Sequence, residues 1–373
     1  MASSAKELPL DILMRIFGFL PVPSVCRLRA VCKQWNALID SPEFGTLCAL
    51  APRQRFYVLL TPGRCRNADA GWCVLDVMDE RFYSLDSSYL VDHAKKANPC
   101  GDETYSLETV DTAGGLFLVA YREKHVLPRF NVLYVCHPVT KTLKRLPPIV
   151  GMAYELTSPI LTVDYSAKTY KVICIGEQMH MYDSQNGQWS ELATPPDRDL
   201  AVCSAVCNNT VYTIFGKRSC HMLLTYSLID DAWSKEGAEL PYNSFEQLVV
   251  VNGEVYLVAG SRTSCFCGQE MCLKSCIIVS KVAPPPKAPE KIARMPETWH
   301  TLLYPPNQDW NNCYGIPSFI AVASECAIVF TSTSGRCIVY DLANRSWRSV
   351  QKRHHYNRKL AASSTTLNPG FLL

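Results

Sequence analysis

The sequence lacks the long apolar run that a membrane-spanning helix requires, since no stretch of about 18 consecutive apolar residues occurs in it. It also lacks a charge bias, because 37 basic residues against 34 acidic ones leave a formal net charge of +3. So small a charge gives no electrostatic footprint for nucleic acid or an anionic membrane. No signal peptide is expected, because Asp11 and Arg15 interrupt the apolar residues near the start. We therefore predict no nucleic-acid or membrane partner, and a location in the cytoplasm and/or nucleus.

Signatures of common catalytic sites are missing as well. The chain contains no phosphate-binding glycine-rich loop, no H-E-x-x-H and no G-x-S-x-G. Its eight histidines are scattered along the chain. We therefore predict a protein that is not an enzyme, with no catalytic residue and no cofactor.

Cysteine is plentiful, with 18 in 373 residues, but the spacing is irregular and no export signal is present. Most of these thiols are predicted to be reduced core residues in strands. One cluster is less clear, because Cys265, Cys267, Cys272 and Cys276 fall within twelve positions. They could bind zinc, form a redox-sensitive thiol loop, or belong to an ordinary hairpin loop; their spacing matches no standard zinc pattern. The sequence leaves these three interpretations open.

The segment from residue 8 to residue 44 has helical periodicity. Apolar residues follow three- and four-residue steps from Leu8 to Leu20, and Pro21 interrupts them. The steps resume at Val25 and continue through Val31 to Ile39. We predict two or three short helices. About 40 residues are at the limit of independent stability, so the cluster is expected to be buried against the rest of the chain or a partner.

Within this helical segment stand Leu8-Pro9, Asp11-Ile12-Leu13, Ile16-Phe17, Leu20-Pro21, Ser24-Val25, Arg27-Leu28, Val31-Cys32-Lys33, Trp35-Asn36 and Ser41-Pro42-Glu43-Phe44. With these motifs the segment resembles an F-box. This resemblance implies attachment to a Skp-type adaptor and, through it, to the cullin and RING subunits of a ubiquitin ligase. It also implies that the adaptor-facing residues are Leu8, Pro9, Ile12, Leu13 and Ile16, whereas Trp35 is expected to pack the motif's own helices.

From about residue 53 the helical period gives way to short β-rich runs that repeat. A tyrosine precedes a tryptophan by seven residues three times, at Tyr182 and Trp189, Tyr226 and Trp233, and Tyr340 and Trp347. The first two copies are 44 residues apart, a period typical of propeller blades. Because these aromatic residues recur with the period, we expect them to fill the space between blades rather than form a binding site.

Weaker copies bring the number of repeat units to six. The predicted fold class is thus a small all-α F-box followed by an all-β propeller of six blades, with four strands a blade. The repeats resemble kelch repeats, although the usual Gly-Gly doublet occurs only at Gly114-Gly115, before a strand. The predicted domains are an N-terminal tail at 1–7, the F-box at 8–48 and the propeller at 53–373. The first blade lacks a strand, and we predict that residues 359–367 supply it, because an unpaired blade edge would be exposed to wrong pairing.

The resemblance implies a subunit that recognises substrates for a ubiquitin ligase, with an unknown protein held on the propeller. An adaptor-bound scaffold that presents no substrate and a propeller oxidase are the alternatives. The longest departures from the repeat are 86–111 and 283–317, and the second contains Trp299 and Trp310 off the packing period. Exposed aromatic residues are favoured in interfaces, so we predict that these two bind the substrate. The alternative is that they cover a blade edge.

Overall fold

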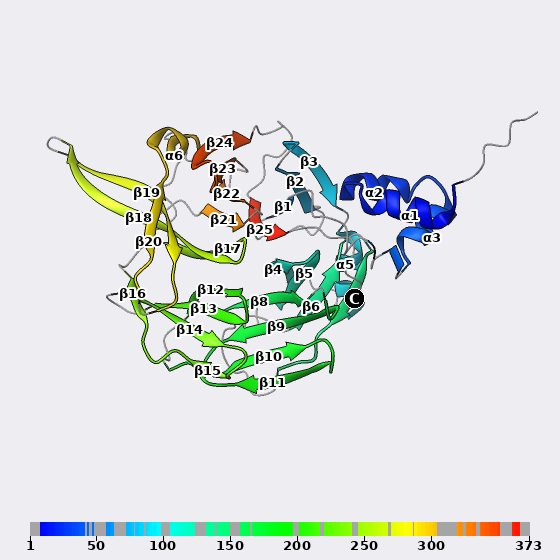
Figure 1. Ribbon diagram of the computed structural model, residues 1–373, viewed down its shortest axis with the longest axis horizontal. Coiled ribbons are helices and arrows are strands. Elements are labelled where there is room, and N and C mark those ends of the chain that lie inside the picture. The colour runs from blue at the N-terminus through cyan, green and yellow to red at the C-terminus, as the bar shows by residue number, and fades with distance from the viewer. Residues whose placement is uncertain are drawn as a thin grey trace, which may run out of the picture.

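The computed structural model describes most of the chain. The described residues are 8–41, 43–44, 47, 57–62, 72–77, 79–85, 87–97, 105–123, 132–138, 140–149, 157–164, 166–196, 201–216, 220–240, 245–267, 270–285, 287–303, 319–323, 326–332, 336–350 and 360–365. A helical cluster precedes a ring of six β-sheets (Figure 1). No helix in these ranges combines the length and the apolar character needed to cross a membrane.

Three short helices form the N-terminal cluster: α1 (Leu10–Gly18), α2 (Val22–Leu28) and α3 (Lys33–Ile39). Proline begins the first two, with Pro9 and Pro21 at the N-cap positions. Their backbone carbonyls accept the first helical hydrogen bonds, and the missing proline N–H costs nothing there.

A small core joins these helices, made of Phe17, Val25, Ile39 and Phe44, which are all buried. The Trp35 ring packs edge-on against Phe17 at a centroid distance of 4.9 Å, which confirms its predicted internal role.

The remaining described strands form six antiparallel sheets, the blades, each of which runs from an innermost strand outward. Blade 1 contains β25 (Leu360–Thr365), β1 (Tyr57–Pro62), β2 (Trp72–Asp76) and β3 (Arg81–Leu85). Blade 2 contains β4 (Tyr105–Ala113), β5 (Leu116–Glu123), β6 (Val132–His137) and β7 (Thr142–Arg145). Blade 3 contains β8 (Thr157–Asp164), β9 (Thr169–Ile175), β10 (Met179–Asp183) and β11 (Gln188–Leu192).

The second half of the ring repeats this order. Blade 4 contains β12 (Ala201–Cys207), β13 (Thr210–Gly216), β14 (His221–Ser227) and β15 (Ala232–Trp233), with β16 (Ala238–Leu240) also paired to β14. Blade 5 contains β17 (Phe245–Val251), β18 (Glu254–Cys267), β19 (Glu270–Val282) and β20 (Glu290–Arg294). Blade 6 contains β21 (Phe319–Ala323), β22 (Ala327–Ser332), β23 (Cys337–Asp341) and β24 (Ser346–Val350). The predicted six-bladed propeller is confirmed.

The C-terminal strand closes the ring. β25 pairs antiparallel with β1, with Tyr57 opposite Thr365 and Pro62 opposite Leu360. It therefore supplies the strand that blade 1 lacks, as predicted from the sequence. Contacts between successive innermost strands run from β25 through β4, β8, β12, β17 and β21 back to β25.

Each gap between neighbouring blades contains its own apolar cluster, and the periodic aromatic residues belong to three of these clusters. Tyr182 lies directly opposite Trp189 on the paired strands, with ring centroids 5.4 Å apart. The Trp189 indole N–H donates to the Pro147 carbonyl, just past the end of blade 2. Trp233 repeats this contact with the Ala193 carbonyl after blade 3. The anchors of blades 3 and 4 therefore fix each of these blades to the one before it, which confirms the predicted packing role.

The two faces of the ring differ in their connections. On one face, tight turns join the first strand to the second in blades 2 to 6, and the third strand to the fourth in every blade except blade 5, where the link from β19 to β20 is longer. All positive-φ residues that the structure describes lie in these turns, among them Asn252 and Gly253 at φ 52° and 74°. The other face receives the connections between the second and third strands and those between blades. We call it the long-connection face.

Two helices on this long-connection face were not predicted from the sequence. α5 (Ser88–Ala97) lies between blades 1 and 2, and α6 (Glu297–Leu303) follows the last strand of blade 5. Both fall in segments where we expected only departures from the repeat. The proline-rich stretch that begins at Ala283 is irregular where the structure describes it, as expected.

Candidate functional site

The first helix carries an exposed apolar stripe. Four residues advance an α-helix by about 400°, so residues spaced by four nearly share one side. Leu8 just before α1, and Ile12 and Ile16 within it, are 53%, 41% and 45% exposed. Phe19, which caps the helix, is 54% exposed and falls at the same angular position. We call Leu8, Ile12, Ile16 and Phe19 the α1 stripe.

The opposite side of α1 faces the core of the helical cluster. Phe17 is buried there, and Leu13 and Met14 pack against the same core. Of the residues predicted to face an adaptor, Leu8, Pro9, Ile12 and Ile16 are thus exposed, whereas the structure places Leu13 partly inside. Their role in binding stays a prediction.

Three exposed apolar residues of the helical cluster were missed by the sequence analysis. Leu10, the first residue of α1, is 44% exposed. Phe19 was not assigned to the docking side, although its spacing of three from Ile16 is a usable signal. Val31 follows the helical apolar pattern and yet is 60% exposed, because it lies between α2 and α3 rather than within a helix.

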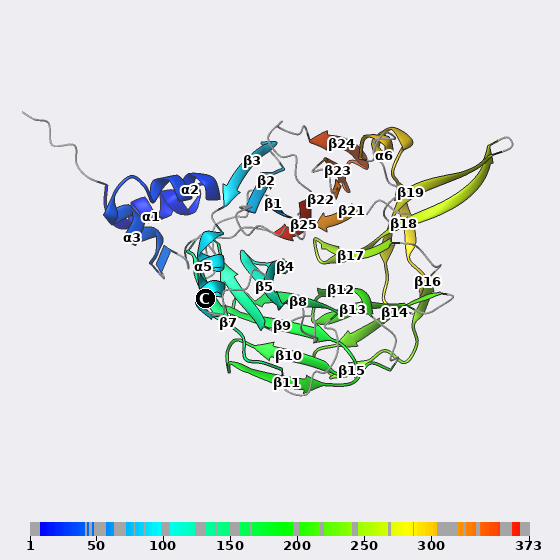
Figure 2. The same ribbon diagram turned by 180° about the vertical axis from the view of Figure 1, so that it is seen from behind.

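The helical cluster contacts the propeller at one edge. It lies beside α5, on the opposite side of the ring from the outer end of β18 and β19 (Figures 1 and 2). Cys26 of α2 packs against the apolar cluster between blades 1 and 2, which also contains Leu90 of α5. Burial raises the pKa of the Cys26 thiol, against the opposing effect of Arg29 and Lys141. The α1 stripe belongs to another helix and remains exposed.

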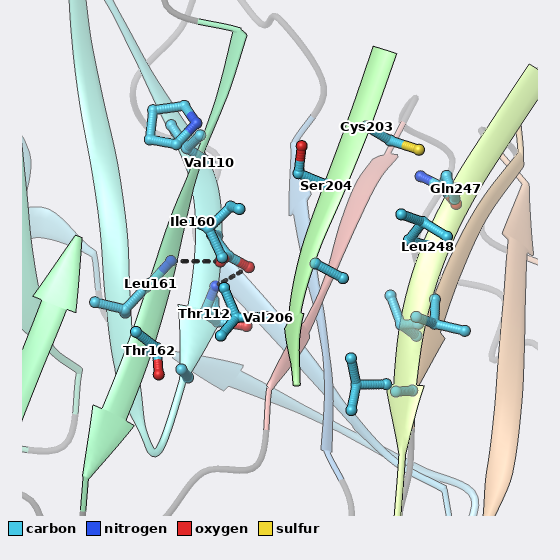
Figure 3. A pocket seen from close by; sticks show the side chains of 18 of the residues that line it. Val110, Thr112, Ile160, Leu161, Thr162, Cys203, Ser204, Val206, Gln247 and Leu248 are labelled. Carbon is cyan, nitrogen blue, oxygen red and sulfur yellow. Dashed lines mark hydrogen bonds between the residues drawn. The ribbon is translucent and has the colours of Figure 1, made fainter. Parts of the chain in front are cut away.

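A cavity of about 470 Å³ runs along the centre of the ring, lined by residues of the innermost strands. Asp111 accepts hydrogen bonds there from the backbone N–H groups of Thr112 and Leu161, at 2.8 and 2.7 Å (Figure 3). Burial raises the pKa of this carboxyl group to about 7, although both hydrogen bonds favour its charged form. Gln247 accepts from the Ala321 N–H at 2.5 Å. These acceptors join blade 2 to blade 3 and blade 5 to blade 6, so they connect neighbouring blades.

Of the two tryptophans predicted to bind a substrate, the structure describes one. Trp299 lies on α6, is half-buried, and packs against the apolar cluster between blades 5 and 6. Its ring therefore contributes to packing, whereas its role in substrate binding stays untested. Trp310 lies outside the described residues.

No group of three His, Cys, Asp or Glu side chains suited to a metal ion occurs among the side chains that the structure describes. Of the four clustered cysteines, only Cys276 has a described side chain, and it is buried in blade 5. The other three lie on the paired strands β18 and β19, where the structure describes their backbone alone.

The helical cluster that carries the α1 stripe matches a known domain family. Residues 6–47 match the F-box domain. The chain carries an F-box. This match covers all three N-terminal helices, so the α1 stripe is a surface of the F-box.

Known relatives of the chain are named as F-box proteins. F-box only protein 6 of Arabidopsis thaliana is 22% identical over 365 residues, which cover 92% of this chain and 69% of that protein. An F-box/kelch-repeat protein from the same plant is 23% identical over 252 residues, 59% of this chain and 55% of its own length. The chain thus spans little more than half of this second relative.

Among solved structures, a quinoprotein alcohol dehydrogenase-like protein from Bacteroides thetaiotaomicron covers 78% of this chain and 61% of its own, at 15% identity. Its TM-score of 0.41 is too low to support any inference about function.

Proposed function

We propose that this protein is a substrate-recognition subunit of a Skp–cullin–F-box ubiquitin ligase. The F-box binds a Skp-type adaptor, and cullin and RING subunits join through that adaptor. The propeller holds a protein to be ubiquitinated, and ubiquitin transfer takes place on the other subunits. In this role the chain is non-catalytic and acts in the cytoplasm and/or nucleus.

The observation that carries the proposal is the α1 stripe within the F-box match. Isolated exposed apolar residues are ordinary on protein surfaces, but a contiguous apolar patch on a small domain is typical of a protein interface. Leu8, Ile12, Ile16 and Phe19 are all more than 40% exposed, and they recur at helical spacing along α1 and just beyond its two ends. A partner surface that covers the stripe would remove this apolar area from water.

The long-connection face of the propeller supports the substrate half of the proposal. Most connections on the other face are tight turns, whereas the connections on this face vary in length without disturbing the packing between blades. The two segments that depart most from the repeat, 86–111 and 283–317, place α5 and α6 on this face, whereas the link from β19 to β20 within the second segment lies on the opposite face. A protein substrate bound there would meet α6, with Trp299 partly exposed beside it.

The adaptor half is tested by replacing Leu8, Pro9 and Ile12 with Ala in the full chain. Truncated interface anchors typically cost more than about 2 kcal/mol each, so the triple variant should lose adaptor binding in a pull-down. Ile229→Ala is the matched control, because Ile229 is 77% exposed in a tight turn of blade 4. Normal adaptor binding by the triple variant, with an unchanged melting temperature, would rule out docking through this stripe.

The substrate half needs a separate experiment. A variant that lacks the F-box should trap substrates on the propeller without passing them to a ligase, and proximity labelling should identify them. Those proteins should accumulate when the gene is deleted. If adaptor binding holds while no captured protein changes in abundance, the chain is an adaptor-bound scaffold instead.

A further inference from the structure

The two middle strands of blade 5 extend well beyond the blade. β18 and β19 have 14 and 13 residues. The pairing of β17 with β18 reaches only to Gly260, and the pairing of β20 with β19 begins only at Ile278. Beyond these points β18 and β19 pair only with each other among the strands that the structure describes, up to Cys267 opposite Glu270. We call residues 262–267 and 270–275 the arm; Figures 1 and 2 both show it projecting from the ring, away from the F-box.

The strand register places three cysteines on one face of the arm. Successive residues of a strand alternate between faces, and directly opposed residues share a face. Cys265 and Cys267 are two residues apart, so they share a face. Cys272 is directly opposite Cys265, and Glu270 is directly opposite Cys267. The other face carries Phe266 opposite Met271.

The register also excludes a zinc site made of all four cysteines. Cys276 is opposite Ser261 at the base of the arm and is buried in blade 5. It stands four residues from Cys272 along β19, a separation of roughly 13 Å, which is too far to share one ion with the other three positions.

We propose that Cys265 and Cys272 form a reversible disulfide across the arm. Directly opposed residues of an antiparallel pair have Cα atoms about 4.5–5.5 Å apart, within the range of about 4.4–6.8 Å that disulfides span. Of the three arm cysteines, these are the two that the ladder holds opposite each other. The bond would cross-link the two strands where no neighbouring strand supports them.

The chemistry requires an oxidant, and a small-molecule disulfide such as oxidised glutathione supplies it. One cysteine thiolate attacks that disulfide, which releases one glutathione thiol and leaves a mixed disulfide. The second cysteine thiolate then attacks the mixed disulfide, forms the Cys265–Cys272 bond and releases the second glutathione thiol. The two protein thiols together give up two protons and two electrons, and the reagent becomes two thiols. Reduced dithiols reverse both steps.

Burial protects many of the blade cysteines from the same reaction. Cys73, Cys136, Cys174, Cys207 and Cys337 are all buried within blades. Burial raises the pKa of Cys136 to about 12 and raises the pKa of Cys174 as well, so neither forms the reactive thiolate. The exposed Cys32 and Cys326 belong to the F-box and to blade 6, far along the chain from each other.

Peptide mapping of the full-length protein tests the bond. The purified chain is incubated with oxidised glutathione, its remaining thiols are alkylated, and it is cleaved with trypsin and a glutamate-specific protease. Cleavage after Arg262, Glu270 and Lys274 gives the fragments 263–270 and 271–274. We expect these fragments to be joined, with Cys267 alkylated, and to separate after treatment with dithiothreitol.

Single variants make the assignment specific. Cys265→Ser and Cys272→Ser should each abolish the joined fragments, whereas the matched control Cys267→Ser should retain them. Joined fragments with Cys265 alkylated, or fragments that never join in the wild type, would overturn the proposal. Stoichiometric zinc that blocks alkylation of the arm in the reduced protein would overturn it as well, in favour of a metal site.

Discussion

At the scale of single residues, the most unusual ionisable group is Asp111 on the innermost strand of blade 2. Its carboxyl group faces the central cavity, and burial raises its pKa from 3.8 to about 7. A raised carboxyl pKa means that the folded protein holds the proton more tightly than the unfolded chain does. The contribution of this carboxyl group to the free energy of unfolding is therefore fully present below about pH 4, and it is lost as the pH rises through about 7.

We predict that this loss distinguishes the wild type from Asp111→Asn, which stays uncharged. Between pH 5 and pH 8, the free energy of unfolding of the wild type should fall relative to that of the variant, by at most about 1.4 kcal/mol per pH unit. Urea unfolding of both proteins across this range measures the difference, because the other titrating groups cancel. Parallel pH profiles would show that the carboxyl group titrates alike in the folded and unfolded states.

A second residue-scale prediction concerns the pair His221 and Glu246, which joins blade 4 to blade 5. Nδ1 of His221 lies 2.5 Å from Oε2 of Glu246, and both side chains are buried. Removing one member of a buried hydrogen-bonded pair takes away that hydrogen bond and leaves the other polar group buried, at a cost of about 1–3 kcal/mol. We expect Glu246→Ala to lower the melting temperature strongly.

Glu239→Ala is the matched control for this experiment, because Glu239 is exposed in the same pair of blades. It should change the melting temperature little. Equal melting temperatures for the two variants would contradict a stabilising role for the buried pair.

At the scale of elements, each periodic tryptophan combines ring packing with one hydrogen bond. The Trp233 ring lies 5.2 Å from Tyr226 and 5.7 Å from Phe215, measured between centroids. Its indole N–H donates to the Ala193 carbonyl at 2.9 Å. Two substitutions separate the two contributions.

We predict that Trp233→Ala costs about 3–5 kcal/mol of unfolding free energy, because it removes the ring from the space between blades 3 and 4. Trp233→Phe keeps an aromatic ring but loses the N–H donor, so it should cost less, about 1–3 kcal/mol for the unsatisfied carbonyl. Chemical denaturation measures both values. If the Phe variant were as unstable as the Ala variant, the hydrogen bond rather than the ring would dominate.

The predicted elements are those whose sequence signal is periodic. Tyr226 and Trp233 are cross-strand partners in one blade, so the seven-residue spacing follows from the geometry of a tight turn. The tyrosine and tryptophan positions were therefore predictable without a structure. The carbonyl that Trp233 binds was not, because nothing in the spacing relates residue 193 to residue 233.

Helices α5 and α6 were missed for a related reason. Each occurs once, between repeat units, and so has no second copy to reveal it. α6 has only seven residues, too few for a clear helical period.

At Val31 the helical spacing was misleading. The spacing predicts a position within a helix, whereas Val31 lies between α2 and α3 and is exposed. The pairing of Cys265 with Cys272 depends on the register between β18 and β19, which the spacing of the cysteines alone left open.

At the scale of the whole molecule, closure of the ring depends on the two ends of the propeller meeting. β25 pairs with β1 over six residues and forms the innermost strand of blade 1. On the outside of the same junction, Arg348 of blade 6 donates to the Glu80 carboxylate at 2.8 Å and to the Val77 carbonyl at 2.9 Å. The apolar cluster between blades 6 and 1 lies between these two contacts. The first and last blades are thus held together along their whole depth.

We predict that a chain ending at Arg353 is insoluble or melts many degrees below the full-length protein. Without β25, the inner edge of β1 loses its hydrogen-bonding partner, and an unpaired edge is open to pairing with other chains. In the intact ring β25 lies between β21 and β4 and contacts both. Its loss would open a gap between these two strands and expose the central cavity there. A chain ending at Leu367, which retains β25, is the matched control and should melt like the full-length protein. Light scattering and thermal melts of the two truncated chains decide the matter, because a soluble Arg353 variant with an unchanged melting temperature would mean that β25 contributes nothing to closure.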